Sequence, residues 1–382
     1  MQTKQPMDEA KIMDTNEGIV LFHPHIPAST ISRVSKVLSG RWIGQGPLVD
    51  EFETRFAASF GKKSKPLAVG SGTDALHLAY LLAGIQAGDE VIVPLFTCTA
   101  TNIPLLYMGA KPVFADIDPA TMNIDVAHVT QLINEKTKAI VCVHYGGLPC
   151  EMDELMALSE KYQIPIIEDA AHALGATYKG QIIGEISPYT MYSFQAIKHI
   201  TTGDGGMLLV PEDVYEKAKR LRWFGIDRSA KQMGIWENDI IETGYKYQMT
   251  DISAAMGLAA LDEFDETLRH RQSLFKAYED RLSNISDVKF IGGKYTDREH
   301  AAWMCTIHIE DRKGLWKKLR ENQIESSQVH YRNDRYSIFG TLKEGLYPNM
   351  DAVEDKYLVL PLHTKMSAQH VEMICNTIQE GW

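Results

Sequence analysis

The sequence predicts an α/β protein built on one mainly parallel β-sheet, because short apolar segments alternate with amphipathic helical segments along much of the chain. Two further apolar segments flank a loop that contains one lysine and three glycines. Together these segments predict about seven buried strands, at residues 67–69, 90–93, 112–114, 139–143, 164–167, 191–194 and 207–210. Ligands bind beyond the carboxyl ends of the strands in such sheets, so the loops there are candidate sites.

Helices and loops can be assigned in order around these strands. Residues 1–30 are expected to form a leader, and its polar first 17 residues resemble neither a signal peptide nor an anchor. Apolar spacing predicts helices over residues 31–38 and 48–60, joined by a glycine-rich loop that either connects them or faces a substrate. A long helix over 253–278 is expected to lead into strands at 288–290 and 303–307 and a closing helix at 367–379. We therefore expect a large domain over 31–265 and a smaller α+β domain over 266–382.

Composition excludes several classes of protein. The 382 residues are 45% hydrophobic and 23% charged, within the globular range, and the formal net charge is −11. That acidic balance argues against a nucleic-acid or anionic-membrane surface, which needs basic patches. No apolar run approaches the roughly 18 residues of a membrane span. The cysteines are scattered without a CxxC pair, which predicts reduced thiols in a cytoplasmic protein and no metal centre.

Three loops carry residues suited to chemistry. The first strand runs into a small-residue turn, residues 70–76, that opens a helix, where free N–H groups and the helix dipole favour a phosphate. The turn lacks a Walker lysine and a GxGxxG pattern, so neither a nucleoside triphosphate nor a dinucleotide is indicated. Asp169 follows the fifth strand, where a buried acid needs a cation or donors. Lys198 lies in the glycine-containing loop. Taken singly, the turn and the acid are better explained as helix caps.

In combination, the three loops predict a pyridoxal 5'-phosphate site, because they share one edge of the expected sheet. The cofactor needs a phosphate cradle, a carboxylate that keeps its pyridine nitrogen protonated, and a lysine whose amine forms a Schiff base with its aldehyde. That amine must be neutral to react, so burial and nearby positive charge should lower the pKa of Lys198. Ser193, five residues earlier, can add a hydroxyl to the phosphate site.

At these residues the chain resembles the DegT/DnrJ/StrS family of pyridoxal-phosphate sugar aminotransferases. The resemblance runs over nearly the whole chain, and the ordered set of motifs is more specific than any one of them. The matching segments are Gly44-Gln45-Gly46-Pro47, Ser71-Gly72-Thr73-Asp74-Ala75-Leu76, Glu168-Asp169-Ala170-Ala171-His172-Ala173, Ser193-Phe194, Lys198, Thr201-Thr202-Gly203-Asp204-Gly205-Gly206 and Leu360-Pro361-Leu362-His363.

The resemblance implies a fold-type I transferase that works as a homodimer with active sites at the subunit interface. By motif, Lys198 is the Schiff-base lysine and proton shuttle, Asp169 the partner of the pyridine nitrogen, and His172 a neighbour of the phenolic oxygen. The residues implied for the phosphate are Gly72, Thr73 and Ser193. The implied reaction moves an amino group from glutamate or glutamine, through the pyridoxamine phosphate form, to a ketosugar that is usually linked to a nucleotide. Family frequency favours a 4-keto-6-deoxy hexose, destined for a surface polysaccharide such as an O-antigen or for a glycosylated metabolite.

Two positions depart from the family pattern. The family often has an aromatic residue that stacks on the cofactor ring directly after a threonine, but here Cys98 follows Thr97. The family also commonly has an asparagine that reaches the phosphate of the neighbouring subunit, and here Lys246 occupies that place. An ammonium group can neutralise a phosphate, so the role is carried over to Lys246.

Three alternatives remain open at this point. The first is a sugar 3-dehydratase of the same family, which would use pyridoxamine phosphate as its cofactor. Those enzymes resemble this chain but have histidine at the position of Lys198. A regulator that only binds the cofactor or a sugar is the second. The third is an aminotransferase for a cyclitol or free sugar, which depends on whether the arginines of residues 328–335 bind a diphosphate or belong to a plain polar loop.

Overall fold

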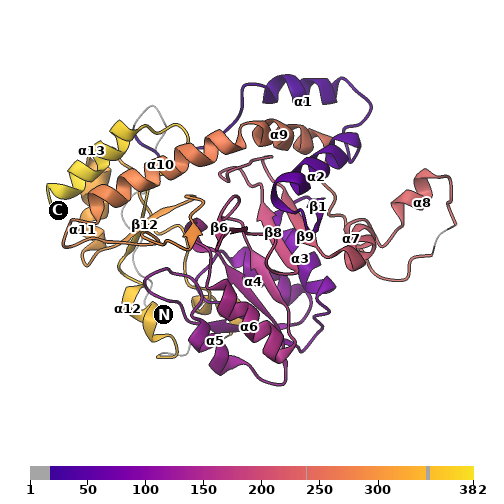
Figure 1. Cartoon of the computed structure of the whole chain (residues 1–382), viewed down its shortest axis with the longest axis horizontal. Coiled ribbons are helices and arrows are strands. Elements are labelled where there is room, and N and C mark those ends of the chain that lie inside the picture. The colour runs from indigo at the N-terminus through magenta and orange to yellow at the C-terminus, as the bar shows by residue number, and fades with distance from the viewer. Residues whose placement is uncertain (1–17, 238, 341–344) are drawn as a thin grey trace.

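The central sheet has the predicted class and strand content. The computed structural model describes residues 18–237, 239–340 and 345–382, and seven of its strands form one sheet (Figure 1). Only β9 runs antiparallel to its neighbours in this sheet, and every other pair of adjacent strands is parallel. In spatial order the strands are β1 (Lys65–Val69), β9 (Gly206–Val210), β8 (Tyr189–Ser193), β5 (Ile166–Asp169), β4 (Thr137–Val143), β2 (Glu90–Pro94) and β3 (Lys111–Ala115).

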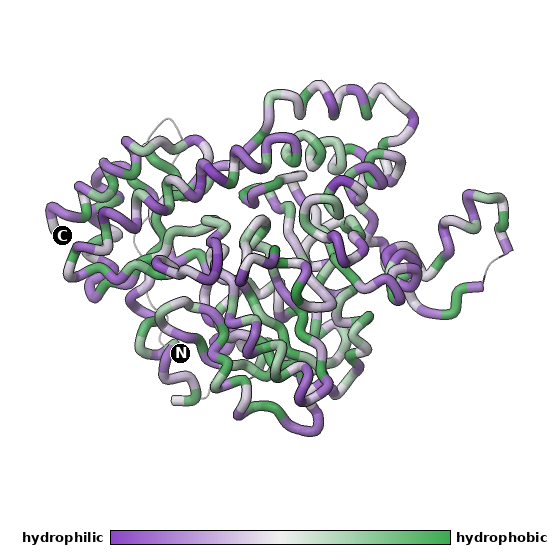
Figure 2. The backbone as a smooth tube through the Cα atoms, in the orientation of Figure 1, coloured by the Kyte–Doolittle hydropathy of each residue, from purple (hydrophilic) through white to green (hydrophobic). Residues whose placement is uncertain are grey.

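Hydrophobic side chains on both faces of the sheet explain why these segments form strands. Side chains alternate between the two faces of a strand, and in β2 Val91 and Val93 join one buried cluster while Ile92 joins another. The strands at the centre of the molecule are accordingly hydrophobic (Figure 2). Helices in the part of the chain that contributes these strands are α1 (Thr30–Leu38), α2 (Pro47–Phe60), α3 (Gly72–Leu82), α4 (Thr99–Tyr107), α5 (Val126–Leu132), α6 (Met152–Tyr162), α7 (Tyr215–Arg222), α8 (Arg228–Gln232) and α9 (Asp251–Asp262).

The C-terminal part forms a second layer of sheet and helices. An antiparallel sheet has the order β10 (Lys289–Phe290), β12 (Cys305–His308), β13 (Tyr357–Leu360) and shares a buried cluster with nearby helices. Those helices are α10 (Phe264–Leu282), α11 (Arg312–Glu321) and α13 (Ala368–Gln379), and α12 (Pro348–Val353) lies closer to α5 (Figure 1). A small sheet of β11 (Arg298–Glu299), β6 (Thr177–Tyr178) and β7 (Gln181–Ile182) joins the two parts of the chain. We propose the division near residue 265 as the domain boundary.

The single helix predicted over residues 253–278 is two helices, so that expectation is wrong. The backbone of Glu263 has φ −105° and ψ 6°, and its N–H bonds back to the Ala260 carbonyl, which closes α9. Phe264, only 4% exposed, then packs edge-on against Phe60 with ring centroids 5.0 Å apart. Burial of this ring fixes the start of α10, and a periodicity in apolar residues does not show such a break.

The expected leader falls partly outside the described residues, which begin at residue 18. From there the chain packs against the C-terminal part. Ile19 donates a backbone hydrogen bond to the Gln323 carbonyl and accepts one from the Glu325 N–H, both at 2.9 Å. Leu21 is 6% exposed within the same cluster as the central sheet. These contacts tie the start of the described chain to the body of the protein.

The topology brings the predicted loops to one edge. The carboxyl ends of β1, β5 and β8 lie together, and β9 begins there with Gly206 opposite both Val69 and Ser193. A Cβ atom on Gly206 would lie 2.5 Å from the Ser71 carbonyl oxygen and 2.8 Å from the Gly72 nitrogen. The turn that opens α3 therefore packs directly on the backbone of β9.

We expect Gly206→Ala to lower the free energy of unfolding by about 1–3 kcal/mol, because the added methyl group meets backbone atoms that cannot rotate away. Denaturant unfolding measures the loss. Gly44→Ala is the matched control, since a Cβ there meets nothing within 4 Å and Gly44 is exposed. Equal stability of the two variants would contradict the close approach of β9 to the turn.

Candidate active site

The turn that opens α3 forms a small-residue cradle. Ser71 caps the helix by accepting a hydrogen bond from the Asp74 N–H at 3.0 Å, which leaves the first turn, with Gly72 and Thr73, facing the sheet edge. A Cβ on Gly72 would lie 3.2 Å from Cβ and 3.4 Å from Oγ of Ser193. The missing side chain at Gly72 thus lets the hydroxyl of Ser193 approach the free N–H groups of the helix. This arrangement can accept a phosphate.

Asp169 ends β5 with its carboxylate almost fully buried. One oxygen accepts a hydrogen bond from Thr101 Oγ1 at 2.7 Å and the other from the Ala171 N–H at 3.1 Å. Thr101 in turn shares a hydrogen bond of 2.9 Å with Thr97. Burial raises the pKa of Asp169, while the hydrogen bond from Thr101 acts in the opposite direction. The buried carboxylate can therefore face a cationic ring nitrogen.

Lys198 lies in the loop between β8 and β9 with its ammonium group away from bulk water. Its Nζ is 3.4 Å from the ring centroid of Trp303. Burial lowers the pKa of Lys198 to about 7, although the charge of Asp169 raises it. A lysine with this pKa supplies a substantial fraction of neutral amine at neutral pH.

His172 belongs to a stack of aromatic rings beside Lys198. Its ring lies 3.8 Å from that of Trp303 at an interplanar angle of 14° and 5.4 Å from that of His330 at 9°. Burial, reinforced by the charge of Lys198, holds the pKa of His172 well below its usual value, so the ring is neutral. Its Nδ1 is buried and has no hydrogen-bond partner among the described residues. A buried nitrogen of this kind suits a polar atom of a ligand.

The positions of Cys98 and Lys246 differ from those of the other predicted site residues. Cys98 is the exposed residue directly before α4. The side-chain amide of Gln248 is oriented so that its oxygen faces two donors. This oxygen accepts hydrogen bonds from Lys246 Nζ at 2.8 Å and from Trp223 Nε1 at 3.1 Å. Within one chain the structure thus engages Lys246 with Gln248, and not with the cradle.

The two arginines of residues 328–335 form ion pairs with carboxylates of the same chain. Arg332 is 1% exposed and pairs with Asp334 at 2.7 Å, Asp351 at 2.5 Å and Glu354 at 3.1 Å. Arg335 pairs with Glu354 at 2.9 Å. Within one chain these ion pairs engage both arginines, which favours a plain polar loop over a diphosphate site for this segment.

Two other residues of the segment 328–335 contribute to the site. The ring of His330 stacks near His172, and its Nε2 is buried without a partner among the described residues. Asn333 donates to the Thr97 carbonyl at 2.8 Å and thereby fixes the loop that carries Cys98.

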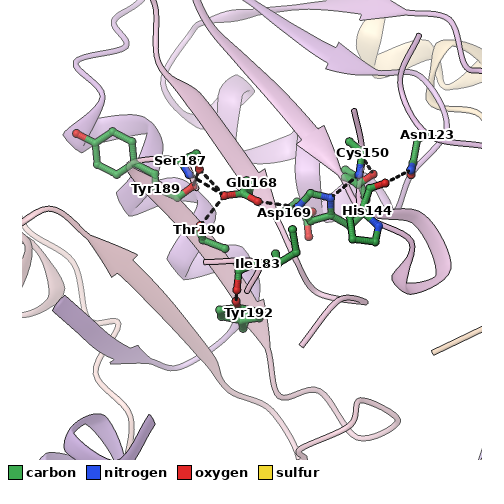
Figure 3. A network of polar contacts seen from close by, with 12 residues as sticks. Asn123, His144, Cys150, Glu168, Asp169, Ile183, Ser187, Tyr189, Thr190 and Tyr192 are labelled. Atoms are coloured by element: carbon green, nitrogen blue, oxygen red, sulfur yellow. Dashed lines mark hydrogen bonds and ion pairs between the residues drawn. The ribbon is translucent and has the colours of Figure 1, made fainter. Parts of the chain in front are cut away.

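A second polar network lies behind Asp169 and holds the strand in place (Figure 3). Glu168 points to the other side of the sheet, where His144 Nε2 lies 2.9 Å away and Ser187 Oγ donates at 2.6 Å. His144 Nδ1 accepts a hydrogen bond from the Cys150 N–H, so the ring is neutral and its Nε2–H donates to Glu168. This hydrogen bond fixes the end of β5 from behind.

Cysteine and histidine in this network have the ligand types of a metal site. The ligand atoms of Cys142, His144 and Cys150 lie within 4.8 Å of one another. Both nitrogens of His144 are engaged, however, because Nδ1 accepts a hydrogen bond from the Cys150 N–H at 3.0 Å and Nε2 pairs with Glu168. A nitrogen that accepts a hydrogen bond has no lone pair left for a metal. We therefore assign the cluster a structural role.

The donor set fits pyridoxal phosphate. The cradle of Gly72 and Ser193 matches the phosphate, Asp169 the ring nitrogen, and the unpartnered Nδ1 of His172 the phenolic oxygen. Lys198 can supply a neutral amine. A mainly parallel sheet with these groups at one edge defines a pyridoxal-phosphate-dependent transferase.

Comparison with known proteins identifies the family. Residues 24–379 match the model of the DegT/DnrJ/EryC1/StrS aminotransferase family, and the chain belongs to it. GDP-perosamine synthase of Escherichia coli O157:H7 is 33% identical over 95% of this chain and 98% of its own. UDP-4-amino-4-deoxy-L-arabinose--oxoglutarate aminotransferase of Shewanella sediminis is 32% identical over 96% and 98%. The structure of Spr1654 from Streptococcus pneumoniae in its PMP-form superposes with a TM-score of 0.89, at 31% identity over 95% and 98%.

The chain is therefore a pyridoxal-phosphate-dependent sugar aminotransferase, and the predicted family, fold, enzyme class and cofactor are confirmed. None of the helices in the described ranges combines the length and apolar character that crossing a membrane requires.

Three residues near the site escaped the sequence analysis. Thr101 stands four positions after Thr97, one helical turn away, and that spacing was a usable signal. Trp303 and His330 come from the C-terminal part, more than 100 residues beyond Lys198. No local pattern marks them, because they meet the site only through tertiary packing.

We expect Thr101→Val to weaken cofactor binding roughly tenfold, because it removes a hydrogen bond to a buried carboxylate without changing side-chain volume. The dissociation constant of pyridoxal phosphate, titrated by absorbance, measures the effect. Thr97→Val is the matched control, since Thr97 reaches Asp169 only through Thr101, and we expect a smaller loss from it. Equal losses from the two substitutions would contradict a direct role of Thr101.

Proposed function

We propose that this enzyme moves an amino group from glutamate, or from glutamine, to a nucleotide-linked ketosugar. The sugar we propose is a 4-keto-6-deoxy hexose, and the product serves amino-sugar synthesis for a surface polysaccharide. The observation that carries the proposal is Lys198, a half-buried lysine whose amine has a pKa lowered to about 7 and lies near Asp169 and His172. The names of two relatives support the substrate class, because they contain a GDP-linked and a UDP-linked sugar, and one also names oxoglutarate. We place the reaction in the cytoplasm.

Each proposed residue has a distinct part in this reaction. Gly72, Thr73 and Ser193 bind the phosphate through N–H and hydroxyl groups. Asp169 keeps the ring nitrogen protonated, and His172 donates to the phenolic oxygen. We place Cys98 against the ring face.

The cofactor, when bound, supplies an electron sink that makes the proton on the adjacent carbon acidic. Lys198 would move a proton between the substrate carbon and the cofactor carbon. This role requires a side chain that both accepts and gives a proton near neutral pH. Glutamate and the sugar use the same site in turn, so Lys198 performs this transfer in both directions.

A projecting arm supports a homodimer. The arm, defined as residues 224–237 and 239–244, includes α8 and extends from the body of the molecule (Figure 1). It exposes Met233 by 74%, Trp236 by 73% and Ile241 by 74%. Large exposed apolar side chains in one segment indicate a protein contact. We propose that the arm packs on a second copy of the chain and brings Lys246, at its base, to the partner's phosphate.

Lys198→Ala tests the reaction. We expect the wild-type protein with pyridoxal phosphate to show a visible band that glutamate abolishes, and the variant to lack the band and lose at least about 10²-fold in transamination rate. Lys198→Arg, which keeps the charge but offers no neutral amine, should behave like Lys198→Ala. A variant that retained the glutamate-sensitive band would exclude Lys198 as the reacting amine.

Assay of one ketosugar with and without its nucleotide then tests the substrate class, and equal kcat/KM for the two would refute a nucleotide requirement.

Trp236→Asp tests the arm. A charge introduced at an apolar contact should shift the protein from dimer to monomer, measured by sedimentation equilibrium at micromolar concentration. Met373→Asp is the control, because Met373 is 45% exposed on α13, at the end of the molecule opposite the arm (Figure 1). If both variants had the monomer–dimer dissociation constant of the wild type, the arm would be ruled out as the interface.

A further inference from the structure

Trp303 is held rigidly beside the reacting lysine by contacts from several elements. Its side chain is 2% exposed, and its indole Nε1 donates to the Ile197 carbonyl at 3.0 Å, one residue before Lys198. Its backbone N–H donates to the Gly146 carbonyl at 2.9 Å. Phe22 stacks on it with ring centroids 5.4 Å apart at 16°. The position of the indole ring is therefore set independently of Lys198.

We propose that Trp303 is a positioning residue that holds the amine of Lys198 on its indole face whenever this amine is not joined to the cofactor. Two distances carry the inference, 3.4 Å from Lys198 Nζ to the ring centroid and 3.8 Å between the rings of Trp303 and His172. The indole thereby keeps Lys198 next to His172 while the amine is free. The inference rests on the proposed role of Lys198.

The contact has a direct physical reason. Among the described residues, no oxygen accepts a hydrogen bond from Lys198 Nζ, and burial disfavours its charge. The face of an indole ring carries negative electrostatic potential, and the attraction of a cation to it grows as water is excluded. Trp303 thus favours the ammonium form that burial opposes. Its effect adds to that of Asp169, which also favours the ammonium form against burial.

Other charged and titratable groups act on Lys198 from the surrounding elements, and any test must keep them unchanged. They come from β5 and its loop, the start of α4, α10, the neighbouring position in the chain and the segment before β13. These groups are Asp169, His172, Cys98, Arg271, His199 and His330.

Trp303→Leu provides the test, with the protein in its pyridoxamine phosphate form, in which the amine of Lys198 is free. The rate at which acetic anhydride labels Lys198, followed by peptide mass spectrometry across pH, reports the pKa of the amine without any turnover. In the wild type we expect an apparent pKa below the usual value of lysine, because the amine is buried. We expect a fall of about one unit in Trp303→Leu, because the ring that stabilised the ammonium form is gone.

Two further variants make the result specific. Trp303→Phe keeps an aromatic face and should retain most of the wild-type pKa. Phe22→Leu removes a ring that packs on Trp303 but supplies no ring to Lys198, so it should change stability and leave the pKa in place. In transamination assays Trp303→Leu should lower kcat and leave KM for glutamate unchanged.

An unchanged pKa of Lys198 in folded Trp303→Leu overturns the inference. If that variant does not fold, Trp303→Met replaces it, and an unchanged pKa there has the same meaning. Failure of the underlying role of Lys198 looks different, because pyridoxal phosphate would then fail to protect Lys198 of the wild-type protein from labelling. That protection is measured before any substitution at residue 303.

Discussion

The site depends on how two carboxylates are buried at consecutive positions of one strand. Glu168 and Asp169 end β5, and alternation along a strand sends their side chains to opposite faces of the sheet. A buried charge is costly unless it is paired or fully hydrogen-bonded. Glu168 meets this requirement internally, through hydrogen bonds from His144 Nε2 and the hydroxyls of Ser187 and Thr190. Asp169 has two hydrogen-bond donors but no directly paired cation among the described residues, which fits a carboxylate that awaits a cationic ligand.

The rest of the site is arranged around Asp169 by elements distant in sequence. β8 and the turn before α3 bring Ser193 and Gly72 together at the same edge of the sheet, and β9 fixes the turn by backbone contact. The C-terminal part completes the opposite side with the rings of Trp303 and His330. Opposing effects meet at Lys198, where burial favours the neutral amine and Asp169 favours the ammonium group. A pKa close to 7 results from that competition.

The parts of the site that follow from strands and their ends were predictable from the amino-acid sequence. The apolar runs predicted the strands of the central sheet, and Asp169 and Lys198 were recognisable because a charged residue beside a buried strand is unusual. Trp303 was missed, because only the fold of the C-terminal part places it on Lys198. The role of Arg332 stayed open for the related reason that its acidic partners Asp351 and Glu354 are 19 and 22 residues away in the chain. Patterns along a chain thus predict local structure, while pairing of charges depends on tertiary contacts.

Internal pairing of Arg332 bears on where a nucleotide substrate can be held. Freeing this arginine for a diphosphate would leave the buried carboxylate of Asp334 without its partner, which is unfavourable. Arg228 and Lys246 differ, because neither forms an ion pair with a carboxylate among the described residues. Arg228 donates to the Gln45 carbonyl, and Lys246 hydrogen-bonds with Gln248. Both lie in or beside the arm, so a dimer formed through the arm would carry these charges to the partner. In that arrangement the proposed dimer and the proposed nucleotide-linked substrate depend on the same segment.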